Sequence, residues 1–250
     1  MIDIHCHLEQ SDYDKDRQEI IQKCKVLDAV ITCCANPKHL ELTLDMCEKN
    51  KGFIFCTLSI HPEYIKELKQ KEIDNYIELI KENSSKIVAI GETGLDYFWI
   101  KEDEWREKQK QLFVKFINLA KELNLPLVIH SRDAVEETIE ILEKQGAKDV
   151  VMHMFGANQL TKRVIDNGWY ISVNTILLKS KKHKKVVRDC PIEKLMLETD
   201  SPWLSPWKNE KRNDPTAVRE VAEKIAEIKK MHIEEVDKIT TENAKRFFRI

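Results

Sequence analysis

Histidine and carboxylate side chains recur at the ends of short apolar runs in this sequence. The runs are MIDIHCH, IVAIGE, LPLVIH, DVVMH and KLMLETD, and they end in His5 and His7, Glu92, His130, His153 and Asp200. Imidazole and carboxylate ligands hold divalent ions such as Zn²⁺ and Mn²⁺, and ions held in this way activate water. The pattern therefore predicts a metal centre and hydrolytic chemistry.

The first two histidines share one face of an extended segment. Because side chains alternate along a strand, His5 and His7 can reach one ion, whereas Cys6 points the other way. Asp3 is expected on the histidine face, where its carboxylate would orient a ligand. An H-x-H pair is also compatible with two hydrogen-bonded histidines at a barrel rim, but the four candidate ligands further along favour a metal site.

Glu92 closes a buried run, where an unpaired carboxylate is costly. Its two oxygens suit a bridge between two ions about 3.5–4 Å apart. A salt bridge with Arg132 is the alternative interpretation. Asp96 is expected to order the following loop or to orient a ligand.

His130 and His153 each end an apolar run and are candidate ligands of a second ion. His130 opens the motif HSRDA, which puts Arg132 beside the metals. There a guanidinium can hold a phosphate oxygen through two parallel hydrogen bonds. An ion pair of Arg132 with Asp133 or Glu92 is the other possibility.

Asp200 lies in ETDSPWLSP. We expect it to ligate the ion of His5 and His7 and to accept a proton from the attacking water. Asp-Ser-Pro is also a good turn sequence, so a structural cap is the alternative.

The remaining histidines differ in their position relative to the runs. His61, in SIHP, is placed to donate to a substrate oxygen, unless it is a plain loop histidine. His39, His183 and His232 follow no apolar run, and we expect them to be exposed.

These residues need elements that bring the ends of distant runs together. Strands are predicted over 1–6, 27–34, 53–60, 87–91, 126–130, 149–153, 169–174 and 194–199, all nearly continuous in apolar residues. Amphipathic stretches alternate with them, such as 107–124. The alternation predicts an α/β fold, a single (β/α)8 TIM-barrel domain over residues 1–250 with the metal site at its C-terminal face. An open doubly wound sheet is the rival, but it would not need ligands from five strands to converge.

The composition limits the possible functions. The formal net charge of −2 excludes a strongly basic nucleic-acid coat, so any polyanion contact must come from a local patch. Seven cysteines without a CxxC pair indicate buried thiols in a reducing cytoplasm. We find no signal peptide and no run long enough to span a bilayer, so a cytoplasmic protein is expected.

The motifs DIHCH, SIHP, GETGLDY, IHSRDA and ETDSPWLSP, taken together, resemble the TatD family of metal-dependent deoxyribonucleases across essentially the whole chain. The resemblance implies an amidohydrolase-type barrel, DNA hydrolysis and two divalent ions (Mg, Mn or Zn). It also implies the ligands of each ion, namely His5, His7, Glu92 and Asp200 for one, and Glu92, His130 and His153 for the other.

Three segments bear on how far this resemblance extends. The family's His-Cys-Phe-Ser-Gly reads HMFGA at 153–157, and its Gly before His-Pro reads Ser59-Ile60. The resemblance implies that the changed loop after His153 lines the substrate side. KRNDP resembles the family's R-N-E-P stretch, which implies that Arg212 and Asn213 order a loop or face the substrate.

Two further segments combine basic and aromatic residues. KSKKHKK (179–185) follows the seventh run, and WLSPWKNEKR (203–212) places Trp203 and Trp207 beside Lys208, Lys211 and Arg212. Such mixtures suit the stacked bases and phosphates of single strands. A solvated helix face for the lysines and a packed lid for the tryptophans are the alternatives.

We therefore expect a metal-dependent phosphodiesterase acting on DNA, with Arg132 and His61 holding the nonbridging oxygens and Asp200 accepting a proton. No membrane or protein partner is indicated. The alternative enzyme is another amidohydrolase acting on a small ester, lactone or amide, but many of those bridge their ions with a carboxylated lysine where this chain has Glu92. A scaffold protein would have no use for six ligands.

Overall fold

Eight parallel strands, hydrogen-bonded in sequence order, form the centre of the structure. A computed structural model describes residues 1–208 and 212–250. The strands are β1 (Ile2–Cys6), β2 (Ala29–Cys34), β3 (Ile54–Leu58), β4 (Ala89–Asp96), β5 (Leu127–Arg132), β6 (Val150–Met152), β7 (Tyr170–Val173) and β8 (Leu195–Leu197). The predicted (β/α)8 barrel is confirmed.

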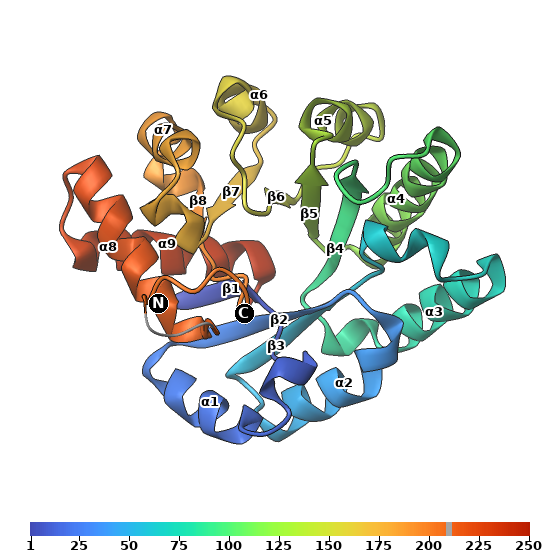
Figure 1. The fold of residues 1–250 in the computed structure, drawn as a ribbon, viewed down its shortest axis with the longest axis horizontal. Coiled ribbons are helices and arrows are strands. Elements are labelled where there is room, and N and C mark those ends of the chain that lie inside the picture. The colour runs from blue at the N-terminus through green and yellow to red at the C-terminus, as the bar shows by residue number, and fades with distance from the viewer. Residues whose placement is uncertain (209–211) are drawn as a thin grey trace.

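Helices surround the strands (Figure 1). Those in the described part of the chain are α1 (Arg17–Lys23), α2 (Leu40–Lys49), α3 (Gln70–Glu82), α4 (Asp103–Leu123), α5 (Val135–Lys144), α6 (Thr161–Asp166), α7 (Lys181–Asp189), α8 (Val218–Lys229) and α9 (Ile233–Phe248). Helix α4 buries the stripe predicted within 107–124, including Leu112, Phe113 and Phe116. None of the helices described is both long and apolar enough to cross a membrane.

Main-chain hydrogen bonds join the first strand to the segment after the last. The Asp200 N–H donates to the His5 carbonyl at 2.9 Å, and the His7 N–H donates to the Ser201 carbonyl at 2.7 Å. These bonds link the two edge strands of the sheet. They also place Asp200 beside His5 and His7, which are distant in sequence.

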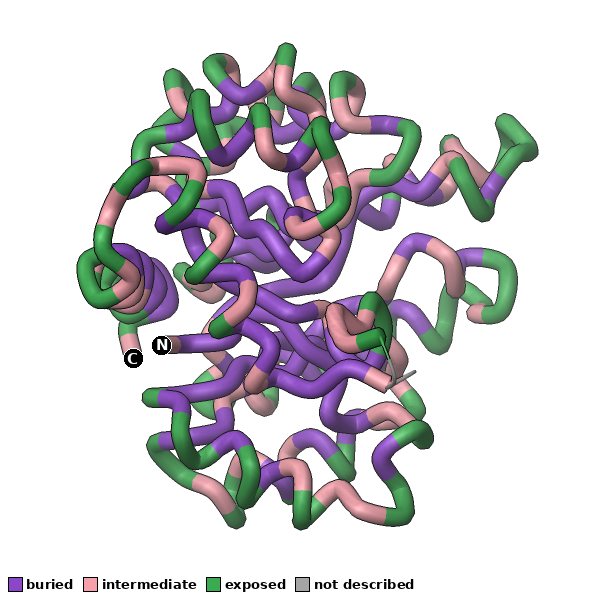
Figure 2. Tube along the Cα trace, turned by 60° about the vertical axis from the view of Figure 1, so that its left-hand side comes forward, coloured by how far each residue is buried: buried purple, intermediate pink, exposed green. Residues whose placement is uncertain are grey.

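The apolar core forms two clusters, and buried residues concentrate on the strands in the middle of the molecule (Figure 2). One cluster includes Ile4, Val128 and Val151, while a larger one holds the contacts between strands and helices. Val128 and Val151 lie two residues before His130 and His153, on the same strand face. The smaller cluster therefore lies directly beneath the candidate ligands.

Two strands extend further than the apolar runs indicated. β4 continues to Asp96 and β5 to Arg132, so Glu92 and His130 lie inside strands rather than at their ends, contrary to the prediction. The register of β4 against β5 shifts between Gly91 and Thr93. Gly94 (φ +148°) passes so close to β5 that an added Cβ would lie 1.9 Å from the His130 carbonyl oxygen, so only glycine fits there.

A second irregularity lies in β1. Its register against β2 shifts between Asp3 and Cys6, which interrupts the simple alternation assumed for this segment. Asp3 accepts hydrogen bonds from the main-chain N–H of His5 and from the N–H and hydroxyl of Thr199. It therefore ties β1 to the chain after β8, and it holds His5 through that residue's main chain.

Candidate metal centre

The six side chains predicted as ligands come together at the C-terminal end of the barrel. His5, His7 and Asp200 form one group whose ligand atoms lie within 4.8 Å of one another, and His5, Glu92 and His153 form a second. His130 joins them through Glu92. Three of them, His5, Glu92 and His130, lie within β1, β4 and β5. The other three, His7, His153 and Asp200, follow β1, β6 and β8.

Glu92 directs its two oxygens to different histidines. Oε2 lies 3.3 Å from Nε2 of His5 and 3.9 Å from Nε2 of His7. Oε1 lies 2.7 Å from Nδ1 of His130 and 3.6 Å from Nε2 of His153. A carboxylate with one oxygen toward each of two ligand groups has the geometry of a bridge between two ions.

Asp200 belongs to the first group only. Its Oδ1 lies 3.5 Å from Nε2 of His7 and 3.7 Å from Nε2 of His5. The main chain of Asp200 also makes a turn, because its carbonyl accepts a hydrogen bond from the Trp203 N–H. The main chain of Asp200 forms a turn while its carboxylate points to the centre. The structural role in the turn therefore does not exclude a role as a metal ligand.

Each of the four histidines offers one ring nitrogen to the centre and the other to a second partner. These pairs are His7 Nδ1 with Glu9 (3.2 Å), His130 Nε2 with Asp96 (2.9 Å), His153 Nδ1 with Glu198 (2.9 Å) and His5 Nδ1 with the Cys33 Sγ (3.2 Å). Such partners fix the tautomer and the orientation of ligand histidines.

Sequence reasoning identified only one of these four partners, Asp96. Glu9 and Glu198 each lie two residues from a candidate ligand, and this proximity in sequence was the signal available for them. Cys33 gave no such signal, because a cysteine in an apolar run looks like any small core residue. Six of the seven cysteines are buried, and Cys47 is half-buried.

Carboxylates and imidazoles shift one another's pKa values at the centre. Burial raises the pKa of Glu92, but the nearby imidazoles of His5 and His153 outweigh burial and hold that pKa well below its usual range. Burial lowers the pKa of His153, but Glu198 and Glu92 overcome it and raise the pKa to about 10. Carboxylates that draw protons onto buried imidazoles would draw divalent cations in the same way.

His61 lies at the edge of the same centre. Its Nδ1 accepts a hydrogen bond from the Glu63 N–H, and its Nε2 lies 3.8 Å from the Glu92 Oε1. Burial and His130 lower the pKa of His61 to about 3, so its ring is neutral. Because Nδ1 accepts, Nε2 carries the hydrogen and can donate toward the centre.

Arg132 makes neither of the ion pairs considered from sequence. Among the described residues, no carboxylate lies within ion-pair distance of its guanidinium. The guanidinium instead lies 3.7 Å from the centre of the Phe98 ring, and Arg132 is exposed at the end of β5. Its hydrogen-bond donors therefore remain open toward solvent.

The two tryptophans of the segment after β8 differ. Trp207 donates its ring N–H to Glu220 and lies under the Lys23 ammonium, so it packs against the protein. Trp203 is 46% exposed, and its ring centre lies 4.9 Å from that of His7. Of these two, Trp203 is the one that remains open at the centre.

The rest of this segment is held to the barrel. Arg212 bonds the Asp12 carbonyl and the Asp16 carboxylate, and Asn213 donates to the Thr199 carbonyl, so both order the loop. The predicted contribution of Lys211 falls outside the described residues.

The basic segment 179–185 leads into helix α7, which begins at Lys181, and Lys181, Lys182 and Lys185 are exposed. His183 within it is buried and His39 is half-buried, so the expectation that they are exposed was wrong, whereas His232 is exposed. His183 also explains a departure from the family motif. A Cβ at Gly156 would lie 2.8 Å from the His183 ring, so a serine there would clash.

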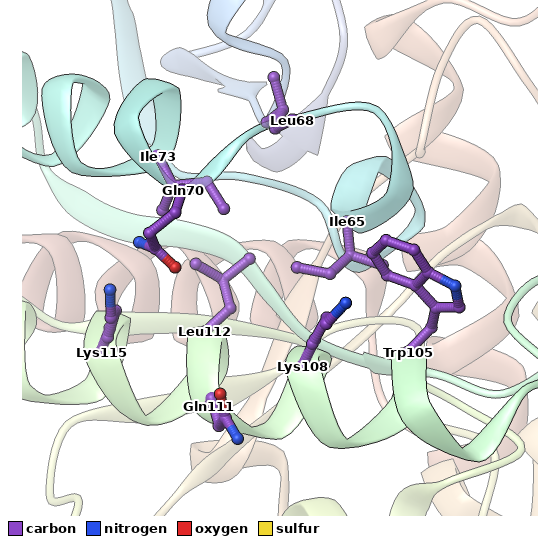
Figure 3. A pocket seen from close by; sticks show the side chains of 9 residues that line it. All are labelled: Ile65, Leu68, Gln70, Ile73, Trp105, Lys108, Gln111, Leu112 and Lys115. Carbon is purple, nitrogen blue, oxygen red and sulfur yellow. The ribbon is translucent and has the colours of Figure 1, made fainter.

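A separate pocket lies on the outer wall between α3 and α4 (Figure 3). It is lined mainly by apolar side chains such as Ile65, Leu68 and Trp105, with Lys108 and Lys115 at its edge. No candidate ligand lines it, so it takes no part in the chemistry of the centre.

The sequence matches the family model described as TatD related DNase over residues 2–249. It is 38% identical to the Bacillus subtilis protein named uncharacterized metal-dependent hydrolase YabD, covering 100% of this chain and 99% of that protein. It is 33% identical to human deoxyribonuclease TATDN3, covering 99% and 94%. The fold matches the crystal structure of YJJV, a TatD homologue from Escherichia coli, with a TM-score of 0.90 at 24% identity over 100% and 98% of the two chains.

Proposed function

This chain belongs to the TatD-related DNase family of metal-dependent hydrolases, and from that premise we propose that it cleaves phosphodiester bonds in DNA. The observation that best supports the proposal is the division of the two Glu92 oxygens between two histidine groups. Two adjacent ions bridged by a carboxylate are the arrangement used in two-metal phosphoester hydrolysis.

The donor set fits two divalent ions. His5, His7, Glu92 and Asp200 would hold one ion, and Glu92, His130 and His153 the other. Mixed imidazole and carboxylate shells accept Zn, Mn or Mg. When bound, the ions would supply positive charge for the phosphate and for activation of a water molecule.

Three side chains would act on the substrate directly. Asp200 would accept the proton of the attacking water, because its carboxylate faces the ligand group of His5 and His7. His61 would donate its Nε2 hydrogen to a nonbridging oxygen. Arg132 would hold a second oxygen with guanidinium donors that no carboxylate in the described residues engages.

The decisive experiment compares substrates on protein stripped of metal and reloaded with one cation at a time. Labelled single- and double-stranded DNA, RNA, and a panel of small phosphodiesters, esters, lactones and amides would each be tested. Metal-dependent cleavage of DNA is expected. Hydrolysis of a lactone or amide in preference to every phosphodiester would contradict the proposal and favour another amidohydrolase chemistry.

We expect the stripped protein to take up about two divalent ions per chain, since two ligand groups share one bridging carboxylate. Equilibrium dialysis against Zn, Mn or Mg, followed by elemental analysis, measures the stoichiometry. Failure to bind any of the three ions would refute the metal assignment.

Helix α7 provides a test of how a long substrate is held. Its N-terminus follows β7 and so lies at the barrel end that carries the metal centre, with Lys181, Lys182 and Lys185 exposed. If these lysines contact phosphates, replacing them with Gln should weaken binding of single-stranded DNA and flatten its salt dependence. Each lost contact lowers the slope of log affinity against log salt by about 0.7.

A matched control replaces three exposed lysines elsewhere, Lys144, Lys148 and Lys230. Lys144 ends α5 and Lys148 follows it, at the opposite end of the barrel. That variant changes the net charge equally but should keep the wild-type slope. If the α7 variant and the control variant show the same slope of log affinity against log salt, the α7 lysines form only a solvated helix face.

A further inference from the structure

Large apolar side chains are exposed at few positions, and most of these lie at the mouth of the barrel. The segment after β4 exposes Phe98 (39%) and Trp99 (57%), and the segment after β8 exposes Trp203 (46%) and Leu204 (38%). In the described residues only Val26, Leu42 and Leu79 are other large hydrophobic side chains with comparable exposure. Apolar groups that gather at one place on a surface mark a binding site.

The two tryptophans flank the metal centre from opposite sides. In a barrel of eight sequentially ordered strands, β4 and β8 are four strands apart and lie across from each other. Trp203 packs beside His7. The main-chain N–H of Trp99 donates to Asp96 at 2.8 Å, and the other oxygen of Asp96 lies 2.9 Å from His130. The Trp203 ring therefore lies beside one ligand group, and the main chain that carries Trp99 is held next to the other.

Positive charge accompanies the Trp99 side. The Arg132 guanidinium lies 3.7 Å from the Phe98 ring centre and 5.8 Å from that of Trp99, and the Lys101 ammonium lies 5.2 Å from Phe98. Exposed rings with cations beside them match a ligand that alternates flat apolar rings with negative charge. A nucleic-acid strand has this chemistry, because bases alternate with phosphates.

We propose that Trp99 and Trp203 stack the unpaired bases on the two sides of the scissile phosphate, so that the centre acts on single-stranded segments or strand ends. The inference rests on the proposed phosphodiesterase function and adds the side chains that select unpaired bases. A base must leave the duplex before it can lie flat on a tryptophan, so paired DNA would be held less well.

The test measures binding by metal-free protein, so that no strand is cut. A thymidine oligonucleotide is compared with an abasic strand of equal length, which keeps the phosphates but has no bases. Wild-type protein should prefer the strand with bases. Trp99→Leu and Trp203→Leu should each reduce that preference by roughly an order of magnitude, with less quenching of tryptophan fluorescence. Leucine keeps an apolar contact with His7 and removes the stacking ring.

Trp105→Leu serves as the control, because Trp105 lines the outer pocket between α3 and α4 (Figure 3) and should leave the preference unchanged. An undiminished preference in the Trp99→Leu, Trp203→Leu double variant would overturn the stacking proposal. Equal binding of both strands by wild-type protein would do the same. Cleavage of DNA by metal-loaded protein tests the phosphodiesterase function separately. The tryptophan variants can lose the preference for the strand with bases whether or not the wild-type protein cleaves DNA, so failure of one proposal is distinguishable from failure of the other.

Discussion

Glu92→Gln protein is expected to fold and to lose hydrolytic activity by about 10³-fold or more. Glutamine keeps the shape of the side chain but removes the negative charge that faces both histidine groups. Uptake of both ions should therefore fall. Metal content after dialysis, the rate of DNA cleavage and thermal unfolding together measure these effects.

Glu102→Gln provides the control for charge removal on the same rim. Glu102 lies between β4 and α4, is exposed, and pairs with Lys66 rather than with any candidate ligand. Its variant should keep both ions and the full rate. Wild-type ion uptake and rate in Glu92→Gln would show that Glu92 is not the bridge.

Asp200→Asn should give a different pattern. Asp200 faces only the group of His5 and His7, so its variant should retain the ion of Glu92, His130 and His153 and lose affinity for the other. The rate should fall by about 10²–10⁴-fold, because the group that accepts the proton of the attacking water is lost. Metal stoichiometry and kcat distinguish this result from that of Glu92→Gln.

Asp133→Asn is the matched control, since Asp133 is exposed on the neighbouring rim and has a positive φ of 56° that asparagine tolerates. It should behave like wild type. If Asp200→Asn hydrolyses DNA at the normal rate, Asp200 has no part in the chemistry and serves only as a turn residue.

Local sequence was enough to locate the strands and to name the six residues that gather at the centre. Parallel strands covered on both faces must be apolar along their length, so each run marked a strand to within a few residues. A histidine or carboxylate where such a run ends then stood out as unusual. The ends of β4 and β5 were placed too early, because polar residues such as Thr93 and Asp96 can continue a strand at the barrel mouth.

The sequence by itself determined where the strands lie along the chain and which types of side chain stand near their ends, because both are local properties of the chain. Only the tertiary structure decided which groups face each other. The register shifts in β1 and β4, the Cys33 thiol behind His5 and the burial of His183 all depend on how strands and helices far apart in sequence pack together. The same holds for Trp203, which is exposed beside His7, and Trp207, which is packed, although the two lie in one short motif. Contacts of this kind arise from register and barrel closure, which no local pattern of residue types specifies.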